Sequence, residues 1–144
     1  QKKTRTMEPK HKTKTRGLRY FFKSEAGYFY PSNKKGYFYP GDTFEFVIAG
    51  TNHNPDIADF KGEFRGRLVP DPTNEYDHNA IRVEHEDGGF VGYVPRKEQQ
   101  ELWNFKGNLP CPCYCYVEYK KEKGERPYYL GHCYVVADYY GELP

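Results

Sequence analysis

The chain has 144 residues, of which 37% are hydrophobic, and a formal net charge of +2. This length fits one ordinary domain with a single hydrophobic core. No apolar run is long enough to span a bilayer, and the first residues lack the pattern of a signal peptide. We therefore expect an intracellular protein of the cytoplasm, nucleoid or nucleus, with no membrane partner.

The composition is rich in aromatic residues and in turn formers. The chain contains 15 Tyr and 10 Phe but one Met and one Trp, and its 14 Gly and 11 Pro are spread along its length. Frequent Gly and Pro are typical of short strands joined by turns. We expect a mainly β protein in which aromatic side chains supply most of the core.

Positive charge is concentrated at the start of the chain. Residues 1–23 contain nine Lys and Arg against one acidic residue, whereas residues 24–144 contain thirteen against nineteen. Residues 1–17 have one apolar side chain, Met7, and are predicted to form a basic flexible tail because they can bury too little surface to order themselves. Residues 18–144 form the predicted domain, and its acidic balance implies that any nucleic-acid site on it is local.

An imperfect aromatic repeat follows the tail. The sequence GYFYP occurs at residues 27–31 and again at 36–40, with a polar tetrapeptide between the copies. This arrangement favours a hairpin or two aromatic edge segments. Such segments either cover the domain or pair with a strand of a partner protein.

The remaining elements are mostly strands. Alternating or apolar runs predict strands at residues 43–49, 60–69, 80–84, 90–94, 112–121 and 128–139, and good helix formers after Pro95 predict one helix at 96–105. The predicted fold is therefore a small OB-like or SH3-like barrel of about six strands with one short helix, preceded by the basic tail.

The most informative stretch is residues 66–96. It contains DPTNEYDHNAI at 71–81, the acidic turn EDGG at 86–89 and VGYVPR at 91–96, and it follows an apolar strand that ends in glycine, VIAG at 47–50. Together these motifs resemble the HIRAN domain. The resemblance covers about residues 43–140 and is strongest at 66–96; residues 1–42 have no counterpart.

The resemblance implies an OB-like barrel, found alone or fused to SNF2-type helicases, that grips the 3′ end of single-stranded DNA. In that binding mode an acidic side chain and a tyrosine hold the terminal nucleotide. The positions of this chain that match or neighbour the family's binding residues are Asn52, His53, Asn74, Tyr76, Asp77 and Arg96. Asn52 and His53 stand where the DNA-binding member has an Arg-Tyr pair, which removes a fixed positive charge.

The residue types suit this role. The carboxylate of Asp77 can accept a hydrogen bond from a free 3′-hydroxyl, which an internal phosphodiester cannot donate. Tyr76 and His53 offer rings for stacking on a base, and Arg96 offers a cation for phosphate. A purely structural role stays open, because Asn and Asp also shape turns and Tyr76 is also suited to a core.

Four cysteines lie at 111, 113, 115 and 133. Zinc motifs favour a C-x₂-C turn, whereas alternation along a strand is expected to spread these thiols too far apart for a metal. We expect small buried side chains, with no metal and no cofactor. The chain has no nucleophile elbow, glycine-rich phosphate loop or H-E-x-x-H motif, so we expect no enzyme.

The leading hypothesis is therefore a module that binds single-stranded DNA or another nucleic acid, and that recognises DNA 3′ ends. The alternative is a protein–protein interaction module that uses the aromatic segment at residues 28–39.

Overall fold

The computed structural model describes residues 21–23, 29–31 and 43–136 of the chain. The predicted tail at 1–17, the second copy of the aromatic repeat at 36–40 and the last residues of the predicted strand at 128–139 lie outside these ranges. The first copy of the repeat contributes β2 (Phe29–Pro31), which pairs antiparallel with β1 (Phe21–Lys23) in a two-stranded sheet.

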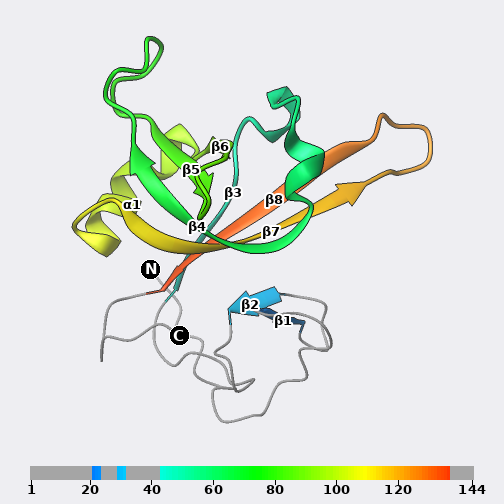
Figure 1. Ribbon diagram of the computed structural model, residues 1–144, viewed down its shortest axis with the longest axis horizontal. Coiled ribbons are helices and arrows are strands. Elements are labelled where there is room, and N and C mark those ends of the chain that lie inside the picture. The colour runs from blue at the N-terminus through cyan, green and yellow to red at the C-terminus, as the bar shows by residue number, and fades with distance from the viewer. Residues whose placement is uncertain (1–20, 24–28, 32–42, 137–144) are drawn as a thin grey trace.

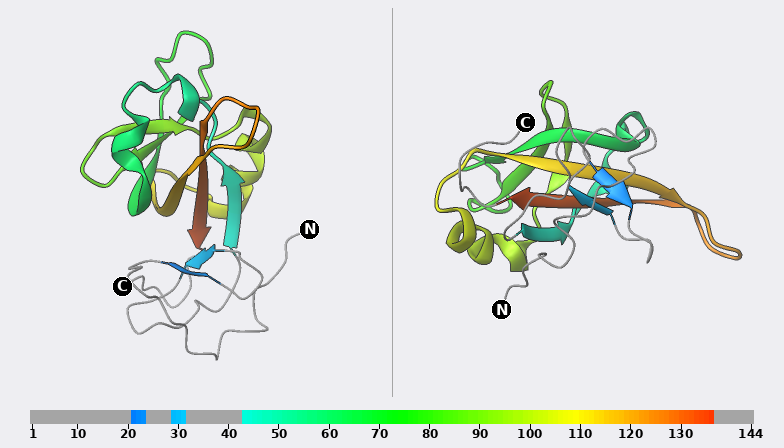
Figure 2. Two further views of the ribbon diagram at one scale, coloured as in Figure 1. Left: turned by 90° about the vertical axis from the view of Figure 1, so that its right-hand side faces the viewer. Right: turned by 90° about the horizontal axis from the view of Figure 1, so that it is seen from below.

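The other described strands form one antiparallel sheet that curls around a buried core (Figure 1). They are β3 (Thr43–Val47), β4 (Gly62–Pro70), β5 (Ile81–His85), β6 (Phe90–Tyr93), β7 (Cys111–Lys120) and β8 (Tyr128–Val136). Their order is β3-β8-β7-β4-β5-β6, and Figure 2 shows β3 and β8 side by side from two further directions. The predicted mainly β fold of about six strands is thereby confirmed.

The core is mostly aliphatic. Alternation along β4 turns Phe64 and Leu68 inward, and alternation along β7 does the same for its cysteines and Val117. The buried cluster consists of Phe46, Ile48, Ile57, Phe64, Leu68, Ile81, Val83, Val91, Val94, Leu102, Val117, Val135 and the four cysteines. The expectation that aromatic residues supply most of the core is therefore wrong for the described residues. Rings such as Phe44 and Tyr129 instead pack against its margin, where a tyrosine hydroxyl can reach a polar partner.

One α-helix, α1 (Gln99–Lys106), lies in the described part of the chain near its predicted position. The first residues of the predicted helix instead form a 3-10 turn, η3 (Arg96–Glu98), in which the Glu98 N–H donates to the Pro95 carbonyl at 2.8 Å. Leu102 anchors α1 in the core. Two further 3-10 turns that were not predicted, η1 (Thr51–His53) and η2 (Ile57–Phe60), separate β3 from β4. None of the helices described here has the length and apolar character needed to cross a membrane.

The curled sheet is joined to itself at one point. Beyond β3 the chain continues through Ala49, whose N–H and carbonyl each form a 2.8 Å hydrogen bond with the backbone of Tyr93 in β6. We call this Ala49–Tyr93 bridge the seam. Gly92 allows the close approach, since a Cβ there would lie 2.6 Å from the Ala49 oxygen. The seam brings the two ends of the strand order together and turns the sheet into a barrel.

Replacing Gly92 with alanine should destabilise the barrel by about 1–3 kcal/mol, because the added methyl collides with backbone that cannot move independently. Urea denaturation followed by circular dichroism measures the change. Gly131→Ala is the matched control, since its Cβ would meet the flexible end of Ile48 at 3.0 Å and that side chain can shift. A Gly92→Ala loss no larger than that of Gly131→Ala would contradict the assigned role of the seam.

Candidate functional site

The loop at residues 71–80, between β4 and β5, is organised by Asn74. Its Oδ1 accepts hydrogen bonds from the N–H groups of Tyr76 at 2.8 Å and Asp77 at 3.0 Å. Its Nδ2 donates to the Tyr93 hydroxyl at 3.2 Å. An asparagine that bonds to the backbone two and three residues ahead is a strong turn former. Asn74 therefore fixes the loop and ties it to β6 at the seam.

Tyr76 projects from this loop into solvent. The residue is 88% exposed, far more than the other exposed large hydrophobic residues described, Val47, Trp103 and Tyr119. It therefore has no place in the core. A large ring left in water does not contribute to folding, and such a ring is a common feature of binding surfaces.

The Asp77 carboxylate lies beside Tyr76 and is partly covered. Its Oδ1 accepts from the Asn79 N–H at 2.9 Å, and its Oδ2 accepts from the Gln99 amide at 2.9 Å and lies 3.5 Å from the Arg96 Nε. The Gln99 and Asn79 donors and the positive charge of Arg96 hold the pKa of Asp77 below its ordinary value of 3.8, against the opposing effect of desolvation. The carboxylate is therefore ionised at neutral pH.

Arg96 is held at one edge and open at the other. Its Nη2 donates to the Tyr76 carbonyl at 3.4 Å, while its Nε faces Asp77. The side chain is nevertheless 74% exposed. Because a guanidinium has five N–H donors, most of them remain available to an anion from solvent.

Asn52 and His53 lie in η1, and Asn52 forms its hydrogen bonds with β8 rather than with the 71–80 loop. The Asn52 amide accepts from the Tyr129 N–H at 2.9 Å and donates to the Tyr129 carbonyl at 3.3 Å. Thr51, which is buried, donates to the same carbonyl at 3.0 Å. Asn52 therefore fastens η1 to β8, whereas the neighbouring His53 is exposed.

Four of the six predicted site residues, Asn74, Tyr76, Asp77 and Arg96, thus form one connected group. Tyr93 connects this group to the segment before η1, because its hydroxyl accepts from Asn74 and its backbone pairs with Ala49. Sequence reasoning gave no role to Tyr93 or Gln99. Tyr93 belongs to the VGYVPR motif, and Gln99 follows Arg96 by one helical turn, so both signals were present in the sequence.

A family model described as the HIRAN domain matches residues 41–140. The chain belongs to the HIRAN domain family. HIRAN domains are associated with nucleic-acid binding. Among solved structures, the HIRAN domain of human HLTF is 19% identical, with a TM-score of 0.42 over 64% of this chain and 74% of that one. No curated protein matches the chain significantly.

In this HIRAN domain, Gln99→Ala should raise the pKa of Asp77 toward its ordinary value, because Gln99 is the largest contributor to lowering it. Since the folded pKa lies below the unfolded one, Asp77 contributes stability that is present above 3.8 and is lost as pH falls through the folded pKa. Gln99→Ala should shrink that acid-sensitive contribution.

A carboxyl-detected NMR titration measures the Asp77 pKa directly. Gln100→Ala serves as the control, since the Gln100 amide donates to Asn104 at 3.1 Å on the same helix. An Asp77 pKa that is equal in the wild type and in Gln99→Ala would rule out the amide as its main stabilising donor.

Proposed function

We propose that this HIRAN domain binds single-stranded nucleic acid and recognises the 3′ end of a DNA strand. The observation that carries the proposal is the exposed ring of Tyr76 beside the ionised carboxylate of Asp77, with the Arg96 guanidinium against the same loop. The association of the family with nucleic-acid binding supports the class of ligand.

Tyr76 supplies affinity that does not depend on sequence. Every base has a flat face, and stacking on an aromatic side chain contributes roughly 1–3 kcal/mol per base. The ring stands clear of the barrel, so a base can approach it without displacing core residues. Asn74 holds the backbone beneath it, which lowers the cost of ordering the loop on binding.

Asp77 supplies the preference for an end. An ionised carboxylate only accepts hydrogen bonds, and it can take about four. Protein donors approach each of its oxygens, so capacity remains for a terminal hydroxyl. The same charge repels a terminal phosphate. Both effects favour a free 3′-hydroxyl over an internal linkage or a phosphorylated end.

Arg96 compensates locally for the acidic balance of residues 24–144. Its exposed donors lie where they can bind the phosphate next to the terminal sugar. The basic residues at 1–16 are expected to add affinity that falls with salt. The Asn52 amide is already hydrogen-bonded to Tyr129. In η1 we therefore assign only the exposed His53 ring to the ligand.

The proposal predicts tighter binding to an oligonucleotide with a free 3′-hydroxyl than to one with a 3′-phosphate. Fluorescence anisotropy at low salt, with the dye on the 5′ end, measures both affinities. Tyr76→Ala should weaken binding by about 5–150-fold through loss of stacking. Asp77→Asn should remove most of the preference between the two ends, because it removes the repulsive charge.

Tyr119→Ala is the matched control, since Tyr119 is an exposed tyrosine, at 44%, on β7 rather than on the 71–80 loop. Its binding should stay close to that of the wild type. Equal affinity for the two ends in the wild type would eliminate end recognition. Lack of binding at low salt would eliminate nucleic-acid binding altogether.

The alternative is a protein-interaction module. It is favoured by the acidic balance of residues 24–144 and by the aromatic repeat, of whose first copy β2 contains the last three residues. An aromatic edge segment can add to a strand of a partner. A pull-down partner retained by both Tyr76→Ala and Asp77→Ala would support this second function. We propose no catalytic role, since the HIRAN domain is a binding domain.

A further inference from the structure

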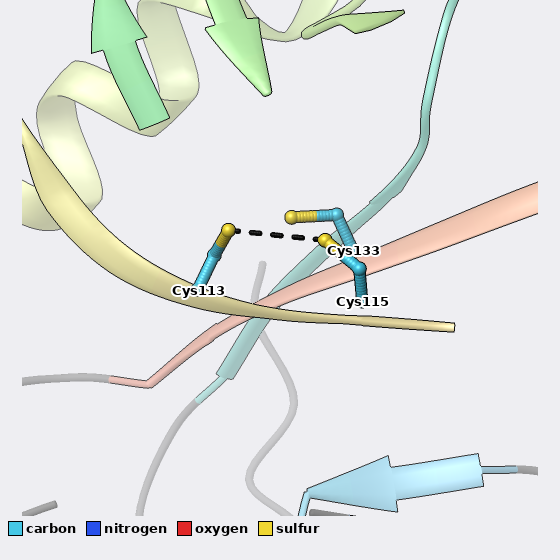
Figure 3. Close-up of side chains that lie close together, drawn as sticks. All are labelled: Cys113, Cys115 and Cys133. Carbon is cyan, nitrogen blue, oxygen red and sulfur yellow. Dashed lines mark hydrogen bonds between the residues drawn. The ribbon is translucent and has the colours of Figure 1, made fainter. Parts of the chain in front are cut away.

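Three of the four cysteines converge in the core (Figure 3). Cys113 and Cys115 share the inward face of β7, and the strand register sets Cys133 of β8 directly opposite Cys115. Their three Sγ atoms lie within 4.8 Å of one another, and those of Cys113 and Cys115 are 3.9 Å apart. The expectation that strand alternation spreads the thiols too far apart is wrong, because Cys113 and Cys115 bring their sulfur atoms together on one face of β7 and β8 supplies the third sulfur.

This spacing suits a metal held by three sulfurs. A metal–sulfur bond of about 2.3 Å in a planar trigonal arrangement places the sulfur atoms about 4 Å apart. The observed separations therefore require only small movements of the side chains. All three residues are fully buried and none forms a disulfide.

The surroundings restrict which metal fits. Phe46 lies opposite Cys133 and Phe64 lies opposite Cys115, so apolar strands flank the sulfur atoms. Among the described residues, no histidine, carboxylate or fourth cysteine completes the cluster. Structural zinc takes four ligands. A soft metal ion of lower coordination number can instead be held by the three sulfur atoms present here.

We propose that Cys113, Cys115 and Cys133 form a buried three-sulfur site for a thiophilic monovalent metal ion, Cu(I). The site is separate from the 71–80 loop and does not depend on nucleic-acid binding. The apolar core would shield the bound ion from water, and therefore from oxidation and from competing ligands.

Cysteine binds a metal as the thiolate, so each metal–sulfur bond formed here replaces an S–H bond. The released protons pass to solvent during the opening of the barrel that admits the ion.

Gly66 of β4 leaves space beside the cluster. Gly66 pairs with Cys113 across β4 and β7, and a Cβ at this position would lie 3.3 Å from the Cys113 sulfur. The lack of a side chain at Gly66 therefore leaves room for that sulfur to move toward an ion.

The test is anaerobic transfer of Cu(I) to the reduced full chain from a chromophoric chelator such as bathocuproine disulfonate. Since the sulfur atoms are buried, transfer proceeds through local opening of the barrel, and the mixture must be left to equilibrate. The expected result is one Cu(I) per chain, with X-ray absorption giving about three sulfur neighbours at about 2.3 Å. Bound Cu(I) should also raise the melting temperature.

Cys113→Ala, Cys115→Ala and Cys133→Ala should each weaken Cu(I) binding by more than the about 10–100-fold that follows loss of an outer-shell partner. The matched control is Cys111→Ala, because Cys111 is also buried on β7 but lies outside the cluster. Circular dichroism establishes that each variant is folded, and the wild-type stoichiometry and absorption spectrum test the site even if a variant does not fold.

Three outcomes would overturn the proposal. The first is folded wild-type chain that takes no Cu(I) from the chelator, and the second is equal loss of binding in Cys111→Ala. The third is preferential binding of Zn(II) in direct competition, which would overturn the assignment of the ion. Oligonucleotide binding should be unchanged in Cys115→Ala, which distinguishes a failure of the metal site from a failure of the proposed nucleic-acid binding.

Discussion

The two backbone hydrogen bonds between Ala49 and Tyr93 hold together both the barrel and its candidate binding surface. They join the ends of the strand order, which a flat sheet would leave as two unpaired edges. They also position Tyr93, whose hydroxyl accepts from Asn74 and so anchors the 71–80 loop. The same two hydrogen bonds therefore close the fold and place the site. Gly92 makes both possible, because a side chain there would hold the strands apart.

The side chains on and beside that loop are held in place by protein hydrogen bonds, yet they keep exposed groups that can bind a ligand. The Asn74 Oδ1 accepts a hydrogen bond from the Tyr76 N–H, which fixes the backbone of Tyr76 while its ring stays in solvent. Asp77 and Arg96 approach each other at 3.5 Å, yet the arginine keeps most of its surface in solvent. A pair of this kind contributes little to stability because water screens it. Its importance lies in presenting opposite charges within one small area, where a sugar hydroxyl and a phosphate are also neighbours.

The sequence predicted features whose partners are close along the chain. Alternation located the strands, and the short segments at 71–81 and 91–96 carried most of the site because Asn74, Tyr76 and Asp77 act on their own loop. Contacts across the fold were not predictable in the same way. The Asn52 amide binds Tyr129, 77 residues away, and Cys133 meets Cys115 only through strand register. The start of α1 was displaced because a 3-10 turn after Pro95 gives no distinct pattern of apolar residues.

The pairing between β5 and β6 has a consequence for how the domain moves. Its register shifts between Val83 and Glu84. On its other side β6 is held by the seam and by the Asn54 amide, which donates to the Phe90 and Val91 carbonyls, whereas β7 is paired with a strand on both sides. Segments with fewer backbone partners undergo sub-global unfolding at lower free energy than the centre of a sheet. The margin that carries the 71–80 loop should therefore open at a lower free energy than β7 at the centre of the sheet, and a ligand bound across it would favour the closed state.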